Sequence, residues 1–152
     1  MIYLSLGSNL GDRNQNIDSA LKALDNVINT KVIASSSKHE TKAIDLPEKT
    51  PDFLNAVVEI ESSLSPVDLL EETKAIEIKL GRTQKNLQTP RTIDIDILFY
   101  NDKIILEDNL TIPHPLLHER YFVLAPLNEI APDFMHPILE QPVSDLLNDL
   151  WV

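Results

Sequence analysis

The chain contains no cysteine and no long apolar run. The absence of cysteine excludes disulfides and thiolate metal sites, and it agrees with a reducing compartment. No stretch approaches the roughly 20 apolar residues that are needed to span a bilayer. The first residues, MIYLSLGSNL, lack the basic start and long apolar segment of a signal peptide. We therefore expect a cytoplasmic protein with no membrane partner.

Glycine and positive charge are also scarce. The sequence has 3 glycines and contains neither a Gly-x-x-x-x-Gly-Lys-Ser/Thr loop nor a kinase-type glycine loop, so phosphates cannot be held in the usual nest of backbone N–H groups. The 13 basic and 24 acidic residues give a net charge of −11, whereas proteins that bind a nucleic-acid backbone show a basic face. Nucleic acid is therefore not an expected partner. A small anion remains possible, because a divalent cation or a local basic cluster can reverse the field inside a cleft.

What is present suits one folded domain. The chain has 152 residues, of which 43% are hydrophobic, and this is enough for a core of ordinary size. Charged residues alternate with apolar ones, and the sequence contains no repeat and no low-complexity linker. We expect a single domain over residues 1–152.

Hydrophobic periodicity predicts alternating strands and helices. Apolar residues at every second position predict strands over residues 2–6 and 53–61. Strands are also expected over residues 32–37 and over residues 93–100, where strong β-formers are concentrated. Helical spacing predicts helices over residues 13–28 and 66–80. Two further helices are expected over residues 121–130 and 143–150.

The sequence also predicts how several of these elements begin, end and face the core. Asp12 and Ser65 are expected N-caps, and Gly81 is an expected C-terminal stop. In the first strand, Ile2, Leu4 and Leu6 are expected to face the core, which makes this a half-buried strand. The expected buried side of the second helix consists of Val67, Leu70, Ile76 and Leu80. Residues 38–52 and 82–92 are polar and are expected to be long loops. The order β-α-β-β-α-β favours an α+β sandwich of ferredoxin-like type, with a mainly antiparallel sheet and helices packed on it.

The most informative stretch is Ile93-Asp94-Ile95-Asp96-Ile97. In a strand, Asp94 and Asp96 share one face, with α-carbons about 6 to 7 Å apart. Two carboxylates at this separation repel each other unless a cation lies between them, and oxygen ligands without His or Cys favour Mg²⁺ over zinc. The alternative is a solvated outer face in which the acids serve solubility.

Cationic residues surround this pair in the sequence. Arg91 directly precedes the strand, and Arg82 and Lys85 lie in the same long loop. A loop of this length with cations above a metal site would suit phosphoryl transfer, which depends on positioning and charge neutralisation. His114 stands between two prolines, which fix the backbone and so its direction. Each of these residues taken alone could equally be an ordinary surface charge or a surface turn.

A third feature is the pair Phe53 and Asn55, which share a strand face opposite the core-facing residues. An aromatic ring beside an amide can bind a flat heterocycle, the ring by stacking and the amide by paired hydrogen bonds. The alternative is a Phe covered by a loop and an Asn that begins a strand.

The residues alone leave three classes of function open. Two aspartates on a strand suit a magnesium-dependent transferase, and they also suit a two-metal phosphohydrolase or nuclease, although the acidic charge argues against a nuclease. A ferredoxin-like binding module without catalysis is the third class.

Taken in order, the motifs resemble the 6-hydroxymethyl-7,8-dihydropterin pyrophosphokinases of folate biosynthesis. The resemblance covers nearly the whole chain. It is carried by residues 5–12 (SLGSNLGD), 52–56 (DFLNA), Glu77, 81–82 (GR), 90–98 (PRTIDIDIL), 112–115 (IPHP), 120–122 (RYF) and 126–127 (PL). It implies an enzyme that transfers the β,γ-pyrophosphate of ATP to the hydroxymethyl oxygen of the pterin and leaves AMP. The expected partners are these two substrates, and the expected state is a monomer.

The resemblance also implies roles for individual residues. Asp94 and Asp96 would bind two Mg²⁺ ions that bridge the triphosphate, and Asp96 would also help to position or deprotonate the attacking hydroxyl. Arg82 and Arg91 would join Asp96 as catalytic residues. The ATP-binding residues would be Glu77, Arg82, Arg91, Ile97, Thr111, His114 and Arg120. The pterin-binding residues would be Thr41, Phe53, Asn55, Asp94 and Phe122.

The chain departs from the family pattern in its two long loops, which resemble the family's mobile flaps. Gln84 stands where the family often has another Arg, Gln88 and Thr89 stand where it often has Trp and Gly, and the loop is one residue shorter. Lys42 replaces a common Pro. These changes concern flap closure and ATP affinity more than the chemistry, and we assign Gln84 no arginine-like role.

Overall fold

The computed structural model describes residues 1–41, 52–81 and 92–150. The principal strands are β1 (Ile2–Ser8), β2 (Thr30–Ser35), β3 (His39–Thr41), β4 (Phe53–Ser62) and β5 (Asp94–Tyr100). Two short strands follow, β6 (Ile105–Glu107) and β7 (Leu110–Ile112). The helices are α1 (Arg13–Asp25), α2 (Pro66–Lys79), the 3₁₀ turn η1 (Leu117–Glu119), α3 (Tyr121–Ile130) and α4 (Val143–Asp149).

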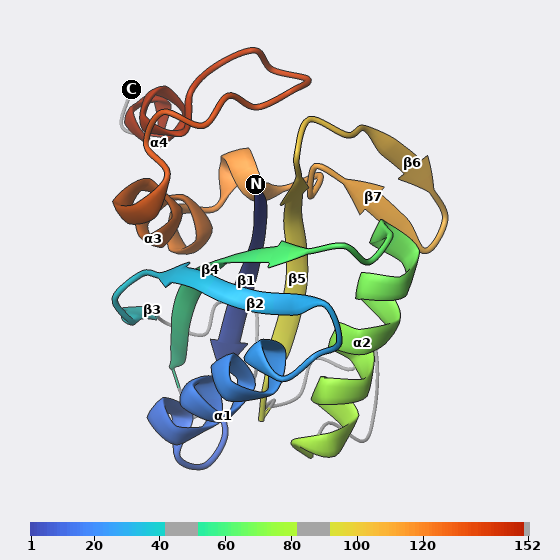
Figure 1. Cartoon of the computed structure of the whole chain (residues 1–152). Helices are drawn as coiled ribbons and strands as arrows, with labels where there is room; N and C mark the ends of the chain where they lie inside the picture. Colours follow the sequence, from blue (N-terminus) through green and yellow to red (C-terminus); the bar gives the residue numbers. More distant parts are fainter. Residues whose placement is uncertain (42–51, 82–91, 151–152) are drawn as a thin grey trace.

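The main sheet has the order β2-β4-β1-β5, with β3 also paired to β4, and each of these pairings is antiparallel. The first and last long strands of the β-α-β-β-α-β unit are therefore neighbours, and β1 lies between β4 and β5 (Figure 1). This arrangement confirms the expected ferredoxin-like fold with an antiparallel sheet. The hairpin β6-β7 forms a separate two-stranded sheet.

Two hydrophobic cores lie on opposite faces of the sheet. The first contains Ile2, Leu4 and Leu6 of β1 together with side chains of α1 and α2. The second contains Tyr3 of β1 together with side chains of α3 and α4. Figure 1 shows α1 and α2 on one side of the sheet and α3 with α4 on the other. The expectation that β1 is half-buried is therefore wrong: Tyr3 is only 3% exposed, because the C-terminal helices form a layer that local alternation cannot predict.

The helix caps agree with the sequence-based expectation. The Asp12 carboxylate accepts a hydrogen bond from the Gln15 backbone N–H (3.0 Å), and the Ser65 hydroxyl accepts one from that of Asp68 (3.1 Å). Gly81 follows Leu80, the C-cap of α2, and has a positive φ of 113°, as a glycine stop requires.

The expected buried face of α2 is wrong at the start of the helix. Val67, expected in the core, is 47% exposed, whereas Leu69 is fully buried. The helix begins at Pro66 with its buried face rotated so that Leu69, Thr73 and Ile76 point inward. Among the described residues, none of the helices is long and apolar enough to cross a bilayer.

Candidate active site

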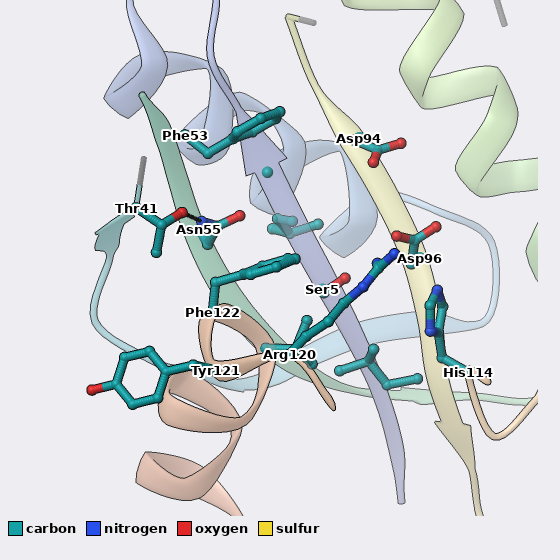
Figure 2. A pocket seen from close by; sticks show the side chains of 14 residues that line it. Ser5, Thr41, Phe53, Asn55, Asp94, Asp96, His114, Arg120, Tyr121 and Phe122 are labelled. Atoms are coloured by element: carbon teal, nitrogen blue, oxygen red, sulfur yellow. Dashed lines mark hydrogen bonds between the residues drawn. The ribbon is translucent and has the colours of Figure 1, made fainter. Parts of the chain in front are cut away.

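A cavity of about 400 Å³ opens on the sheet face that carries α3 and α4, beyond the part that these helices cover (Figure 2). On this face of each central strand, the residues nearest α3 and α4 pack in the second core, and the residues farther along the strand line the cavity. In β1, buried Tyr3 is followed by Ser5 and Gly7. In β4, read backwards, buried Val57 is followed by Asn55 and then Phe53. The cavity therefore lies where the second core ends.

Strand register places the cavity residues in rows across the sheet. Gly7 lies between Asn55 of β4 and Asp94 of β5, and Ser5 lies between Val57 of β4 and Asp96 of β5. Paired residues project from the same face, so β1 forms the floor between an amide on one side and two carboxylates on the other. The central strand thus brings together the two features that the sequence suggested separately.

Asp94 and Asp96 both line the cavity and are partly exposed, as the strand alternation predicts. Within the described ranges, no group of three or more His, Cys, Asp or Glu side chains could form a complete metal cage. Mg²⁺ is commonly held by one or two carboxylates while water and substrate phosphates complete the shell. Two carboxylates on an open cavity therefore fit Mg²⁺ bound together with a polyphosphate.

His114 lines the cavity beside this pair and has a fixed orientation. Its backbone N–H donates to the Leu98 carbonyl (3.0 Å), and its ring Nδ1 accepts from the Leu116 backbone N–H (3.2 Å). Burial, reinforced by the positive charge of Arg120 and opposed by Asp94, lowers the pKa of His114 to about 4. The ring is therefore neutral at pH 7. Because Nδ1 accepts, the proton lies on Nε2, which can donate a hydrogen bond.

Arg120 and Phe122 come from the start of α3. The Arg120 guanidinium carbon lies 5.5 Å from the centroid of the Phe122 ring, a distance that suits a cation–π contact. Arg120 extends from α3 toward β5 (Figure 2), so it brings positive charge into the half of the cavity that contains Asp96 and His114.

The other half of the cavity is formed by Phe53, Asn55, Thr41 and Phe122. The Asn55 amide group donates to the Thr41 hydroxyl (2.8 Å), and Asn55 is only 7% exposed. Figure 2 shows the Phe53 and Phe122 rings on opposite sides of the space in front of Asn55. The arrangement provides two apolar ring faces and a fixed polar edge, as a flat heterocycle requires.

Three of the expected ATP-binding residues do not line the cavity. Glu77 on α2 is 7% exposed, and its carboxylate accepts from the Ile95 backbone N–H (2.8 Å), so it contacts the strand that carries the aspartates. Ile97 is in the first core, because it alternates with Asp96 along β5. Thr111 lies in β7, and its hydroxyl donates weakly to the Glu107 carbonyl (3.4 Å).

Several expected residues lie outside the described part of the chain. These are Arg82, Arg91, Lys42, Gln84, Lys85, Gln88 and Thr89. Conversely, Ser5 and Gly7 line the cavity, although no motif in the sequence indicates an individual role for either residue. The sequence feature that could have identified them is the alternation of β1, which places Ser5 and Gly7 on the same face as Tyr3.

A family model and curated relatives that match most of the chain carry the same pyrophosphokinase name. A family model described as 7,8-dihydro-6-hydroxymethylpterin-pyrophosphokinase matches residues 3–132. The 2-amino-4-hydroxy-6-hydroxymethyldihydropteridine pyrophosphokinase of Haemophilus influenzae is 43% identical over 135 residues, which are 89% of this chain and 84% of that protein. The protein of the same name from Aquifex aeolicus is 40% identical over 144 residues, or 95% of this chain and 88% of that one.

Longer relatives contain a similar segment. The folic acid synthesis protein fol1 of Schizosaccharomyces pombe is 41% identical over 148 residues, which are 97% of this chain but only 20% of that protein. This chain therefore spans about a fifth of its length. A solved Plasmodium falciparum HPPK-DHPS structure has a TM-score of 0.74 at 20% identity, covering 97% of this chain and 43% of that one, and it supports the fold. The family match and the two bacterial relatives show that the chain belongs to the 7,8-dihydro-6-hydroxymethylpterin-pyrophosphokinase family.

Proposed function

We propose that this chain transfers the β,γ-pyrophosphate of ATP to the hydroxymethyl oxygen of 6-hydroxymethyl-7,8-dihydropterin. The products are AMP and the pterin diphosphate, an intermediate of folate biosynthesis. One observation carries the proposal: the aromatic and amide half of the cavity and the carboxylate half share a floor formed by Ser5 and Gly7. A heterocycle bound in one half can therefore present its substituent to a polyphosphate in the other.

The pterin half supplies binding and orientation. Phe53 and Phe122 would stack on the two faces of the ring. The Asn55 amide, held by Thr41, would pair with the polar edge of the pterin. Because the Asn55 nitrogen donates to Thr41, the carbonyl oxygen is left on the side toward Gly7 and the cavity, where it can accept from a ring N–H or amino group.

The polyphosphate half supplies charge and directed donors. Asp94 and Asp96 would hold two Mg²⁺ ions, which when bound polarise the β-phosphorus and neutralise charge on the leaving group. His114 would donate from Nε2 to a phosphate oxygen, and Arg120 would balance the negative charge of the triphosphate. Glu77, Ile97 and Thr111 would support ATP binding from outside the cavity lining, and Arg82 and Arg91 would complete the site.

The transfer itself is a displacement at the β-phosphorus. The hydroxymethyl oxygen forms a bond to that phosphorus while the bond between the β-phosphorus and the α,β-bridging oxygen breaks, so AMP departs with the bonding electrons. Asp96 would orient the hydroxyl and accept its proton. The positive field of Arg120 stabilises charge that develops on the transferred group.

The proposed enzyme is one cytoplasmic domain over residues 1–152 that acts as a monomer. The net charge of −11 supports small substrates over nucleic acid. Sedimentation at assay concentrations checks the monomer.

A product assay separates this function from the other two classes. The protein is incubated with ATP, Mg²⁺ and the hydroxymethyldihydropterin, and nucleotides are resolved by ion-exchange chromatography. We expect AMP and the pterin diphosphate in equal amounts, with no turnover when the pterin or the metal is omitted. Formation of ADP, or ATP loss without pterin, would refute the proposal in favour of a phosphohydrolase. Binding of both ligands without any product would identify a non-catalytic module.

A further inference from the structure

Ser37, His39 and Glu129 form a polar cluster outside the cavity. Glu129, on the last turn of α3, accepts from the Ser37 backbone N–H (2.9 Å) and from the Ser37 hydroxyl (2.9 and 2.8 Å to its two oxygens). The His39 ring nitrogen Nε2 also contacts this carboxylate. Burial alone would raise the pKa of Glu129, but the hydrogen bonds from Ser37 and His39 lower it below the usual value. The cluster is therefore built around a carboxylate that stays charged at neutral pH.

The cluster does not have the geometry of a hydrolytic Ser-His-Glu triad. In such a triad, one ring nitrogen faces the serine and the other faces the acid. In this cluster, Nε2 of His39 faces both the Ser37 hydroxyl (3.3 Å) and Glu129, and the Ser37 hydroxyl donates its proton to the acid directly. The cluster therefore joins chain segments and does not activate a nucleophile.

The segment that the cluster holds is also fixed from its other side. Lys38 and Glu40 alternate with Ser37, His39 and Thr41 and form ion pairs with α1: Lys38 with Asp18 (2.6 Å) and Glu40 with Arg13 (2.8 Å). The short strand β3 is thus held between α1 and α3.

Both ends of α3 contact the half of the cavity that is proposed to bind the pterin, one end directly and the other through β3. Phe122 and Glu129 are seven residues apart in α3, which is close to two helical turns, or about 10 Å, so they project from the same side of the helix. In β3, His39 lies opposite Asn55 and Thr41 lies opposite Phe53. Glu129 therefore connects the helix that carries one aromatic ring to the strand that abuts the other ring and the amide.

We propose that Glu129 is a positioning residue for the pterin: through Ser37 and His39 it fixes β3 against α3 and so sets Phe122 and Thr41 relative to Asn55. This inference rests on the proposed function. It requires the pterin half of the cavity to depend on the cluster more strongly than the polyphosphate half does. Asp94, Asp96 and His114 of the polyphosphate half come from other elements, whereas Arg120 of that half precedes α3.

The test compares Glu129→Ala and the milder Glu129→Gln with Glu71→Ala and Glu71→Gln, which alter an exposed glutamate of α2. Steady-state AMP formation is measured with the pterin varied at saturating ATP, and then with ATP varied at saturating pterin. We expect Glu129→Ala to raise the KM for the pterin by about tenfold, equivalent to about 1.4 kcal/mol, and to leave the KM for ATP within about twofold. Both Glu71 variants should behave like the wild type.

A conservative pair on the other side of the cluster provides the rescue test. Ser37→Ala, which removes the hydroxyl donor, should raise the pterin KM, whereas Ser37→Thr, which retains it, should not. Adding Ser37→Ala to Glu129→Ala should have little further effect, because the two residues act through one contact. Hydrogen exchange of the backbone amides in residues 37–41 should rise in Glu129→Ala, while exchange in β1 stays unchanged.

The outcomes separate the two proposals. If the wild type forms no pterin-dependent AMP, the proposed function fails regardless of the variants. If the wild type is active, an unchanged pterin KM in Glu129→Ala overturns the positioning role, even when exchange in residues 37–41 rises. An equal rise in the KM for both substrates also overturns it, because that result would indicate general destabilisation.

Discussion

Replacement of Gly7 by alanine tests the floor of the cavity. An ideal Cβ at Gly7 would lie 3.1 Å from the Asn55 side-chain oxygen and 3.9 Å from the Phe53 ring. The 3.1 Å contact is tight, and Asn55 has little freedom to move because it is buried and donates to Thr41 at 2.8 Å. The added methyl group therefore displaces the amide or occupies space that the substrate ring needs.

The expected size follows from the cost of overpacking, which is typically about 1 to 3 kcal/mol for an added methylene in a well-packed site. If that cost appears only when the pterin binds, the KM for the pterin rises about 5-fold to 150-fold. The fold itself should tolerate the change. Gly7 does not have a positive φ, and alanine in a strand recovers roughly 0.5 to 1 kcal/mol of the entropy that glycine loses.

The assay for Gly7→Ala is AMP formation with the pterin varied at saturating ATP, accompanied by denaturant unfolding. We expect a higher KM for the pterin, a KM for ATP within about twofold of wild type, and an unfolding free energy within about 1 kcal/mol of wild type. A pterin KM that does not change would refute the conclusion that Gly7 lies beneath the ring. A parallel rise in the KM for ATP would show that the methyl group distorts the whole face.

Three further predictions concern single side chains. Asp94→Asn and Asp96→Asn should each reduce kcat by at least about 10²-fold while the circular dichroism spectrum stays unchanged; near-normal turnover in both would remove the metal assignment. Phe122→Leu should raise the pterin KM by about tenfold, since stacking on an aromatic side chain contributes about 1 to 3 kcal/mol per base, and an unchanged KM would argue against the sandwich. His136 is 4% exposed, its Nδ1 accepts from two backbone N–H groups, and burial, followed by the charge of His118, lowers its pKa. The stability that neutral His136 contributes should therefore be fully present above the usual pKa of 6.5 and be lost as the pH falls through the lower pKa of the folded state. His136→Asn, which retains an acceptor, should reduce the dependence of the unfolding free energy on pH in this range.

Local patterns predict the elements well because strand and helix periods are set by the backbone. The alternation of β4 places Phe53 and Asn55 on the face opposite Ala56 and Val58, and the structure has them there. Local patterns cannot predict the second layer over Tyr3, since nothing near β1 in the sequence indicates which distant helices will cover its other face. Strand β3 escapes prediction for a related reason: it has only 3 residues, and pairing with β4 stabilises it.

The candidate site is predictable as separate parts but not as one cavity. The alternation Asp94-Ile95-Asp96 predicts two acids on one face, yet their distance from Asn55 depends on the strand order β4-β1-β5, which is a tertiary property. The same alternation in β1 identifies Ser5 and Gly7 only once that order is known. Ile97 illustrates the opposite case. The strand pattern places it in the core, where it lies, while the family resemblance associates it with ATP.

A structure of the protein with Mg²⁺, an unreactive ATP analogue and the hydroxymethyldihydropterin tests the central claim most directly. We predict that the pterin ring lies between Phe53 and Phe122 above Gly7, with its edge on Asn55 and its hydroxymethyl oxygen toward the β-phosphorus. We also predict metal density on Asp94 and Asp96. A pterin bound elsewhere, or a triphosphate and metal bound away from these two carboxylates, would contradict the account.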